Sequence, residues 1–515
     1  MILQLSSVII IIIEATVMNI VHKIEIQKLI IIIYTPSTMS VTSYEFKQNN
    51  AVSSIIDIGL PEGATFGTLK VHMAQKQMIT TPTTIQFTLD HSNSMIGEKL
   101  TQLIRTVTNI LRVIVECNMP FSVKIDAFHS AYTKIIPLTV VTKENMEELI
   151  TKVSDIRASN NTNIENALIQ SQADLDPTAY HFFLTDGEPT DGAFEVDILT
   201  KFVREDITAF FIGYGEDHNA ELLSKCANKN AGNSSYQLVT QVETIGDLCG
   251  ELLNEICYPA LKEVVITTNN PGEYLFHPIT NEWTNKIVLN QLISEKEYTF
   301  FICSLEPFTG VVLSGIDPNS GNIEMNELFS DSLELVDLTI DLFKFKTNSL
   351  LADAIVRKEG VYEELSLYFN QIHRYAREKG LLEDPAFKIM FDDIFLTYSK
   401  YHTSNGMMYA LSRDVSNRRQ QNYRVSSQTP TNVDVLERTV SQHQVARSIS
   451  VQDYDEDIYN EEHIDDDEDQ DEAHLAIDIL PSIDIDDISL YVPNESSVDI
   501  SSTQTMRRLI RQVSS

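Results

Sequence analysis

An aspartate and two serines stand on alternate residues of this chain, at Asp90, Ser92 and Ser94. Alternate residues of a tight loop can point to the same side, and a small hard cation such as Mg²⁺ prefers oxygen ligands. The same residue types also cap helices, because their side chains accept hydrogen bonds from the first turn. The motif by itself therefore leaves two alternatives open, metal binding and helix capping.

The flanking residues predict that this motif lies between a strand and a helix. Apolar Ile85, Phe87 and Leu89 alternate with polar residues, which is typical of a strand that ends at Asp90. Residues 95–117 then place apolar side chains at helical spacing. In open α/β sheets, ligands bind at the carboxyl ends of the strands. We expect the loop to be exposed, so that Asp90 can be replaced without loss of the fold.

Two later loops offer further oxygen ligands. Thr162 lies in a polar loop that runs into a predicted helix at residues 163–173. Asp186 follows the apolar stretch Tyr180–Thr185, which is typical of a buried strand. Three separate loops, each beside a predicted strand end or helix start, therefore present Asp, Ser, Ser, Thr and Asp.

In the order, spacing and strand context of these residues, the chain resembles the von Willebrand factor A (vWA) domain family. The resemblance implies an α/β fold, a doubly wound and mostly parallel sheet with Mg²⁺ (or Mn²⁺) at its top. Asp90, Ser92, Ser94, Thr162 and Asp186 fall on the five positions of the family's metal-ion-dependent adhesion site, or MIDAS. It further implies that the three hydroxyls bind the cation directly and that the two carboxylates do so mainly through water.

Two other residues of the first loop bear on this interpretation. Asn93 stands where the family usually has glycine. Asparagine tolerates a left-handed backbone better than most residues, so we expect the loop to keep its shape. We expect His91 to face solvent or to lie behind the ligands, and not to bind the cation.

Composition limits the class of protein. The 515 residues are enough for two to four domains, and 43% of them are hydrophobic, which supports a real core. The 74 acidic residues outnumber the 38 basic ones, and the net charge of −36 argues against a nucleic-acid partner. The five cysteines are scattered, without paired spacing, which favours a reducing compartment and no zinc site. We expect an intracellular, cytoplasmic protein, or a virion component if the source is a large DNA virus with AT-rich codons.

The N-terminal residues 1–43 form a hydrophobic leader that we expect to lie outside the fold. Its isoleucine-rich runs are too short to span a bilayer and charged residues interrupt them, so we expect no stable membrane insertion. A secretory signal peptide would need a basic start and a small-residue cleavage site, which are not evident. The alternative is an upstream extension of the reading frame, with Met39 as the working start.

The rest of the chain divides by its patterns. Strands alternating with helices predict a mostly parallel sheet covered on both faces. The expected strands are at 121–128, 180–185 and 207–213, and the expected helices at 144–153, 163–173, 195–204, 220–227 and 242–256. Residues 333–345 also alternate and suggest one more strand. The predicted domains are strands at 44–83 that join a β-sandwich, a vWA domain at 84–258, the β-sandwich at 259–346, a helical segment at 347–419 and a disordered acidic tail at 420–515.

The β segment, the helices and residues 406–419 together resemble plant-type eukaryotic vWA proteins that usually also carry a RING finger. A RING needs about eight Cys and His ligands in paired spacing, and this sequence has no such set. We also find no Walker loop, GxSxG or HExxH motif, so we expect a non-enzymatic protein. The predicted function is a metal-dependent interaction module that binds a carboxylate of a protein partner. The alternative is an adaptor in ubiquitination that lacks its own RING.

Overall fold

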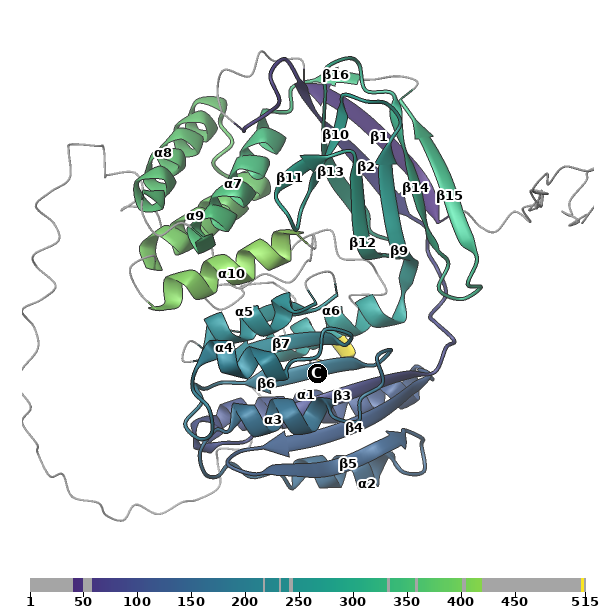
Figure 1. The fold of residues 1–515 in the computed structure, drawn as a ribbon, viewed down its shortest axis with the longest axis vertical. Helices are drawn as coiled ribbons and strands as arrows, with labels where there is room; N and C mark the ends of the chain where they lie inside the picture. Colours follow the sequence, from purple (N-terminus) through teal and green to yellow (C-terminus); the bar gives the residue numbers. More distant parts are fainter. Residues whose placement is uncertain are drawn as a thin grey trace, which may run out of the picture.

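The computed structural model contains three β-sheets and a group of helices (Figure 1). In Figure 1 an α/β unit lies below, two further sheets lie at the upper right, and helices lie at the upper left. The isoleucine-rich leader and the acidic block fall outside the described residues. Those described are 40–49, 58–215, 218–230, 233–239, 244–330, 334–356, 360–400, 404–418 and 511–513.

The lower unit is built on a six-stranded sheet in the order β5-β4-β3-β6-β7-β8. Neighbouring strands from β4 to β8 are parallel, and β5 runs antiparallel to β4 at the edge. Because β3 and β6 are parallel neighbours, their carboxyl ends lie together. The strands are β3 (Thr83–Asp90), β4 (Phe121–Phe128), β5 (Tyr132–Val140), β6 (Tyr180–Thr185), β7 (Thr208–Tyr214) and β8 (Ser235–Val239).

Helices cover both faces of this sheet, as the predicted α/β fold class requires. Ile85, Phe87 and Leu89 of β3 pack in one apolar core with α1, α2 and α6. Phe183 and Phe211 pack on the other face with α3, α4 and α5. The helices are α1 (Glu98–Glu116), α2 (Met146–Ser154), α3 (Ile164–Gln172), α4 (Val196–Leu199), α5 (Ala220–Asn228) and α6 (Ile245–Cys257).

The helix predicted at 195–204 is much shorter than expected. Only the four residues of α4 are α-helical, and Thr200–Phe202 form a 3₁₀ turn. Val203 then has an extended backbone, with φ −82° and ψ 125°, which ends the helical path.

Two further sheets pack face to face around a single apolar core. One has the order β11-β10-β13-β2-β1-β16 and the other β12-β9-β14-β15. Since β2 precedes the α/β unit and pairs with β13 after it, the α/β unit is inserted in a β-sandwich. The strands are β1 (Val41–Asn49), β2 (Thr65–Met73), β9 (Pro259–Thr268), β10 (Glu273–His277), β11 (Glu282–Thr284), β12 (Lys286–Ile293), β13 (Glu297–Ser304), β14 (Gly310–Ile316), β15 (Ile323–Phe329) and β16 (Glu334–Val336).

The N-terminal strand begins earlier than the sequence predicts. β1 starts at Val41, and both Ser40 and Val41 are buried. The backbone N–H of Ser40 donates to Glu324 Oε2 at 3.0 Å. The prediction that residues 1–43 lie outside the fold is therefore wrong for residues 40–43. Residues 42–45 of β1 are exposed, so the start of this strand carries no apolar pattern.

The four C-terminal helices share one apolar core with Phe66 of β2 and also contact the α/β unit. Met408 and Tyr409 of α10 lie in the same core as α5 and β8. The strand predicted at 333–345 is wrong beyond β16, because α7 begins at Thr339 and the Asp337 carboxylate accepts a hydrogen bond from the Thr339 N–H at 2.9 Å. These helices are α7 (Thr339–Val356), α8 (Val361–Lys379), α9 (Pro385–Lys400) and α10 (Ser404–Arg418).

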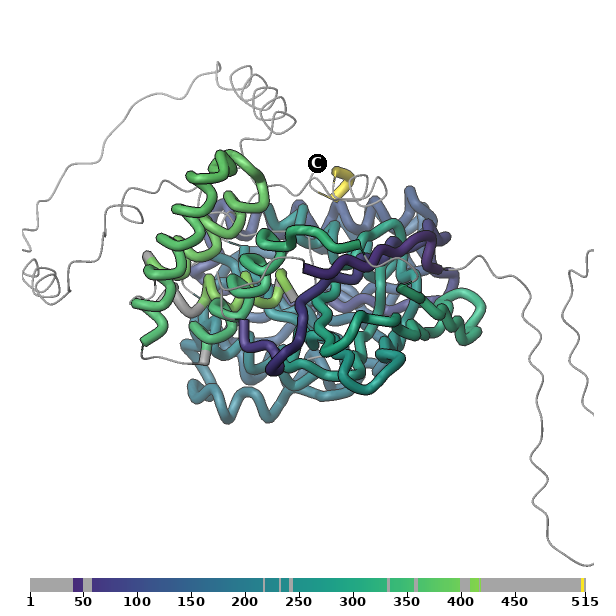
Figure 2. Tube along the Cα trace, turned by 90° about the horizontal axis from the view of Figure 1, so that it is seen from above, coloured from purple at the N-terminus to yellow at the C-terminus, as the bar shows by residue number. Residues whose placement is uncertain are grey.

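A short helical segment, Arg511–Val513, packs against the α/β unit (Figure 2, yellow). Val513 is buried in the core beside α1, and its carbonyl accepts a hydrogen bond from Asn109 Nδ2 at 3.1 Å. The prediction of a disordered tail at 420–515 is therefore wrong for these three residues. Across the part of the chain that the structure describes, none of the helices has the length and apolar character needed to span a membrane.

Candidate metal centre

Asp90 lies at the carboxyl end of β3 and is completely buried. Its Oδ1 accepts a hydrogen bond from the Ser92 N–H at 2.8 Å, and its Oδ2 accepts one from the Thr185 hydroxyl at 2.6 Å. Because Thr185 ends β6, this contact joins two neighbouring strand ends. The loop is exposed at Asn93 and Ser94 as expected, but Asp90 itself is not, which removes the reason given for expecting that it can be replaced without loss of the fold.

The two serines lie next to the second carboxylate. Ser92 Oγ is 2.9 Å from Ser94 Oγ, and the Ser94 hydroxyl donates to Asp186 Oδ1 at 2.6 Å. Asp186 is completely buried, whereas Ser94 is exposed. In this group of side chains the carboxylates of Asp90 and Asp186 are therefore buried, and the side that carries Ser94 is open to solvent.

The capping alternative does not describe these side chains. The N-cap of α1 is Gly97, and the helix has no side-chain cap bond. Ser92 precedes the short 3₁₀ turn Asn93–Met95, and its side chain makes no capping bond there either.

Thr162 belongs to a separate loop, and its hydroxyl lies beside Gly187, as the hydroxyl of Ser94 does. Its backbone N–H donates to Thr190 Oγ1 at 2.8 Å, and its carbonyl accepts from the N–H of Thr190 at 2.9 Å, which fixes the loop. A Cβ added at Gly187 would lie 3.5 Å from Ser94 Oγ and 3.6 Å from Thr162 Oγ1. The two hydroxyls thus face a common space next to a residue without a side chain.

Backbone hydrogen bonds hold the first two loops together. The Asn93 N–H donates to the Asn160 carbonyl at 3.0 Å, and the Ser159 N–H donates to the His91 carbonyl at 2.9 Å. The structure therefore brings together all five residues that the sequence singles out, Asp90, Ser92, Ser94, Thr162 and Asp186.

Comparison with known families identifies the domain that carries these residues. A model of the von Willebrand factor type A domain matches residues 84–250. This part of the chain is a vWA domain. Heavy chain 4 of inter-alpha-trypsin inhibitor from Mus musculus is 30% identical over 176 residues, which are 31% of this chain and 18% of that protein. Heavy chain H2 from Sus scrofa is 27% identical over 206 residues, 37% of this chain and 22% of that protein.

The matched region spans about a fifth of the length of these relatives. Among solved structures, a von Willebrand factor type A protein from Catenulispora acidiphila is 14% identical, with a TM-score of 0.48, over 75% of this chain and 98% of that chain. Proximal thread matrix protein 1 of the mussel byssus, with a zinc-occupied MIDAS motif, is 18% identical, with a TM-score of 0.29, over 38% of this chain and 51% of that chain.

Burial and a neighbouring negative charge disfavour the ionised form of Asp90. Burial raises the pKa of the Asp90 carboxyl to about 6, although hydrogen bonds from Thr185 and Ser92 lower it. The negative charge of Asp186 raises the Asp90 pKa further. An added cation would relieve both the burial cost and the repulsion.

Two contacts of this site were not predicted from the sequence. One is the Thr185 hydroxyl on Asp90, and the other is Lys99, whose Nζ lies 2.7 Å from Asp186 Oδ2. Thr185 directly precedes Asp186 and Lys99 lies in the first turn of α1, so both are sequence neighbours of the motif.

His91 and Asn93 differ from expectation in their details. Of the two positions expected for His91, the solvent-facing one is wrong, because the side chain is buried and its Nδ1 lies 2.8 Å from the Arg157 carbonyl. Burial lowers the pKa of the His91 ring, which favours its neutral form. Asn93 begins a right-handed 3₁₀ turn and is not among the residues with positive φ, so the left-handed backbone considered for it does not occur.

The donor set fits a small hard cation. Hydroxyl and carboxylate oxygens converge, as Mg²⁺ and Mn²⁺ prefer, and a Gly187 Cβ would intrude on the space between two of them. No three His, Cys, Asp or Glu side chains gather as a metal cluster within the described ranges. That finding is compatible with this site, because it contains two carboxylates and three hydroxyls.

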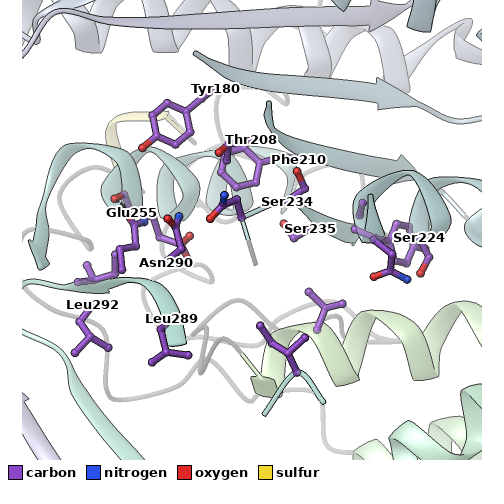
Figure 3. A pocket seen from close by; sticks show the side chains of 18 of the residues that line it. Tyr180, Thr208, Phe210, Ser224, Ser234, Ser235, Glu255, Leu289, Asn290 and Leu292 are labelled. Carbon is purple, nitrogen blue, oxygen red and sulfur yellow. Dashed lines mark hydrogen bonds between the residues drawn. The ribbon is translucent and has the colours of Figure 1, made fainter. Parts of the chain in front are cut away.

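A cavity of about 130 Å³ lies elsewhere, between the vWA domain and the β-sandwich (Figure 3). Tyr180, Thr208 and Ser235 line it, and they begin β6, β7 and β8. The cavity is therefore at the amino ends of the strands, opposite to Asp90 and Asp186. The candidate metal centre is not part of it.

Proposed function

We propose that the vWA domain is a metal-dependent protein-interaction module that binds an acidic side chain of a protein partner through Mg²⁺ (or Mn²⁺). The observation that carries the proposal is the space beside Gly187, which the hydroxyls of Ser94 and Thr162 approach from different loops. Asp90 and Asp186 lie behind these hydroxyls and are fully buried.

Each residue has a distinct role in this proposal. Ser92, Ser94 and Thr162 would hold the cation through their hydroxyl oxygens, and Asp90 and Asp186 would hold its water molecules. When bound, the cation would supply a positive position that accepts an anionic oxygen. Neutral hydroxyl ligands compensate less of its charge than carboxylate ligands would, and this favours a carboxylate from the partner.

The existing hydrogen bonds prepare the hydroxyls for this role. A serine hydroxyl has one proton to donate and two lone pairs. Ser94 donates its proton to Asp186 at 2.6 Å, so Ser92 is the donor in the 2.9 Å contact between the two serine hydroxyls, and one lone pair of Ser94 remains for a cation. Ser94 is exposed, so this side of the centre can meet the surface of another protein.

We propose a binding role and not a catalytic one. A catalytic site needs a placed base or nucleophile. The ring within the loop, His91, lies buried against the Arg157 carbonyl and the ring of His129, at a centroid distance of 4.6 Å.

Calorimetry of Mg²⁺ and Mn²⁺ binding tests the metal part of the proposal. Wild-type protein should bind one ion, and Ser94→Ala should weaken binding by at least about tenfold. Thr178→Ala is the matched control, because Thr178 is an exposed hydroxyl of the same domain that donates to Asp176 Oδ1, two residues away, at 2.6 Å. It should bind metal like wild type. Thermal melts establish that each variant is folded.

The partner part is tested by immobilising the protein with Mg²⁺ or with EDTA. Partners should be retained with Mg²⁺, released by EDTA, and lost in Ser94→Ala. Substituting the acidic residues of a retained partner should abolish its binding. Retention that is equal with Mg²⁺ and EDTA would contradict the proposal.

A further inference from the structure

Lys99 lies inside the candidate metal centre. Its ammonium nitrogen is 2.7 Å from Asp186 Oδ2, and the Lys99 side chain is only 26% exposed while that of Asp186 is 0% exposed. A Cβ added at Gly215, whose φ is +87°, would lie 3.5 Å from the same nitrogen. The ammonium thus lies between the buried carboxylate of Asp186 and the backbone of Gly215, which directly follows β7.

This contact differs from the ion pairs on the surface of the same domain. Lys225, for example, pairs with Glu221 at 2.9 Å, but both side chains are about half exposed, at 44% and 54%. Such pairs contribute little because water competes for both charges. Asp186 has no exposed surface, so water does not solvate its carboxylate. Ser94 and Lys99 donate hydrogen bonds to it instead.

Helix stability does not account for the position of Lys99. It is the second residue of α1, in the first turn, where the helix dipole favours negative side chains and disfavours positive ones. Its placement is instead explained by the buried carboxylate that it contacts.

We propose that Lys99 is a resident cation of the metal centre: it stabilises Asp186 when no metal is bound and lowers the affinity of the site for a divalent ion. The inference rests on the proposed metal-binding function and concerns how that site is regulated. The two carboxylates alone would carry a formal charge of −2, and with Lys99 the group carries −1. A divalent ion that enters the site is therefore attracted less strongly by the carboxylates. It is also repelled by the ammonium of Lys99, which lies beside Asp186.

Lys99→Met tests the inference, because it keeps the unbranched stem and removes the charge. The Mn²⁺ affinity measured by calorimetry should rise by about tenfold or more, since an adjacent positive charge is lost. Without metal, the melting temperature should fall, because Asp186 is left buried with fewer donors. Saturating Mn²⁺ should then raise the melting temperature of Lys99→Met by more than that of wild type.

Two further variants separate charge from structure. Lys346→Met is the matched control, because Lys346 is 22% exposed and pairs with Glu364 at 3.2 Å outside the vWA domain. It removes the same charge from the protein and should leave the Mn²⁺ affinity unchanged. Lys99→Arg keeps the positive charge and should bind Mn²⁺ like wild type. If Lys99→Met does not fold, Lys99→Gln retains a hydrogen-bond donor without charge and should show the same gain in affinity.

The outcomes distinguish this inference from the proposed function. If wild type binds Mn²⁺ and the uncharged variants bind it equally or more weakly, the inference is overturned and the metal site stands. If only the uncharged variants bind Mn²⁺, the inference is supported and the function proposed for wild type falls. If neither binds Mn²⁺, both are wrong.

Discussion

The two ends of the vWA sheet bury their charged groups in different ways. At the carboxyl end, Asp90 and Asp186 are held by loop side chains next to an exposed Ser94. In the linker that leads from β2 to the amino end of β3, the ammonium of Lys76 lies 3.0 Å from Asp317 and 3.2 Å from Glu324 of the β-sandwich, and all three side chains are nearly buried. The carboxyl end is arranged around a space that opens at Ser94, and the amino end faces the β-sandwich.

The path of the chain explains this difference. The vWA domain is entered and left at its amino end, where the Ile79 N–H donates to the Cys257 carbonyl at 2.9 Å. The Ser294 N–H of the sandwich donates to the Tyr258 carbonyl at 2.9 Å. The amino end of the sheet therefore attaches the vWA domain to the β-sandwich. The proposed partner would bind at the opposite, carboxyl end. Changes at one end should leave the property of the other end intact.

The largest effect is expected at the attachment. Lys76→Met leaves Asp317 and Glu324 nearly buried without their shared cation, and breaking a buried ion pair costs about 3–5 kcal/mol. Chemical denaturation should show this loss, whereas calorimetry of the folded variant should show unchanged Mg²⁺ affinity. A matching loss of metal affinity would mean that the two ends are coupled.

A smaller effect is expected from His181, which lies in β6 between the two ends. Burial lowers the pKa of the His181 ring from 6.5 to about 3, with a further contribution from Lys124. As the pH falls below 6.5, the unfolded chain binds a proton that the folded chain does not, so stability is lost progressively down to about pH 3. The loss at pH 5 amounts to about 2 kcal/mol.

His181→Gln tests this assignment by removing the titrating group. Denaturation curves from pH 7 to pH 5 should show a shallower loss of stability in the variant than in wild type. An unchanged pH dependence would show that other groups cause the acid sensitivity.

At the carboxyl end, Gly187→Ala should affect metal binding and not the fold. Gly187 has no positive φ, and the added methyl would be in ordinary contact with Ser94 Oγ and Thr162 Oγ1, at 3.5 and 3.6 Å. The methyl occupies the space between the hydroxyls, so Mg²⁺ affinity should fall by about tenfold, which corresponds to about 1.4 kcal/mol. Calorimetry and a thermal melt on the same sample measure both quantities. A large drop in melting temperature would mean that this space is packed and not reserved for a ligand.

The smallest effect is expected for the C-terminal contact. Val513 is buried beside α1, but it belongs to a short segment. Val513→Asp should release this segment and lower stability by about 1 kcal/mol, below the roughly 1.5–3 kcal/mol of a fully buried aliphatic side chain, because the released segment regains conformational entropy. Metal affinity should not change. Hydrogen exchange in α1 would report the release, and unaltered protection of α1 would contradict it.

The five candidate site residues could be predicted because each one stands at a recognisable strand end or helix start. Thr185 and Lys99 could not, because the atoms they contact belong to residues 95 and 87 positions away. Side-chain contacts between loops depend on the order of the strands in the sheet, which a local pattern does not contain.

The fold was predictable where apolar and polar residues alternate clearly in the sequence. β3 buries alternate apolar residues against α1, whereas β5 is an edge strand with mostly exposed residues and an internal Pro137, so it has no such signal. Residues 333–345 show the opposite problem. Leu342, Phe343 and Phe345 are buried on a helix, and over so short a stretch their spacing also fits a strand.

The central claim is that hydroxyls from two loops share one divalent ion. The most direct measurement is anomalous diffraction from crystals of the protein grown with Mn²⁺. The account predicts one manganese peak bounded by Ser92, Ser94 and Thr162, with Asp90 and Asp186 behind it. A map in which these residues keep their mutual hydrogen bonds and no manganese lies among them, at saturating Mn²⁺, would contradict it.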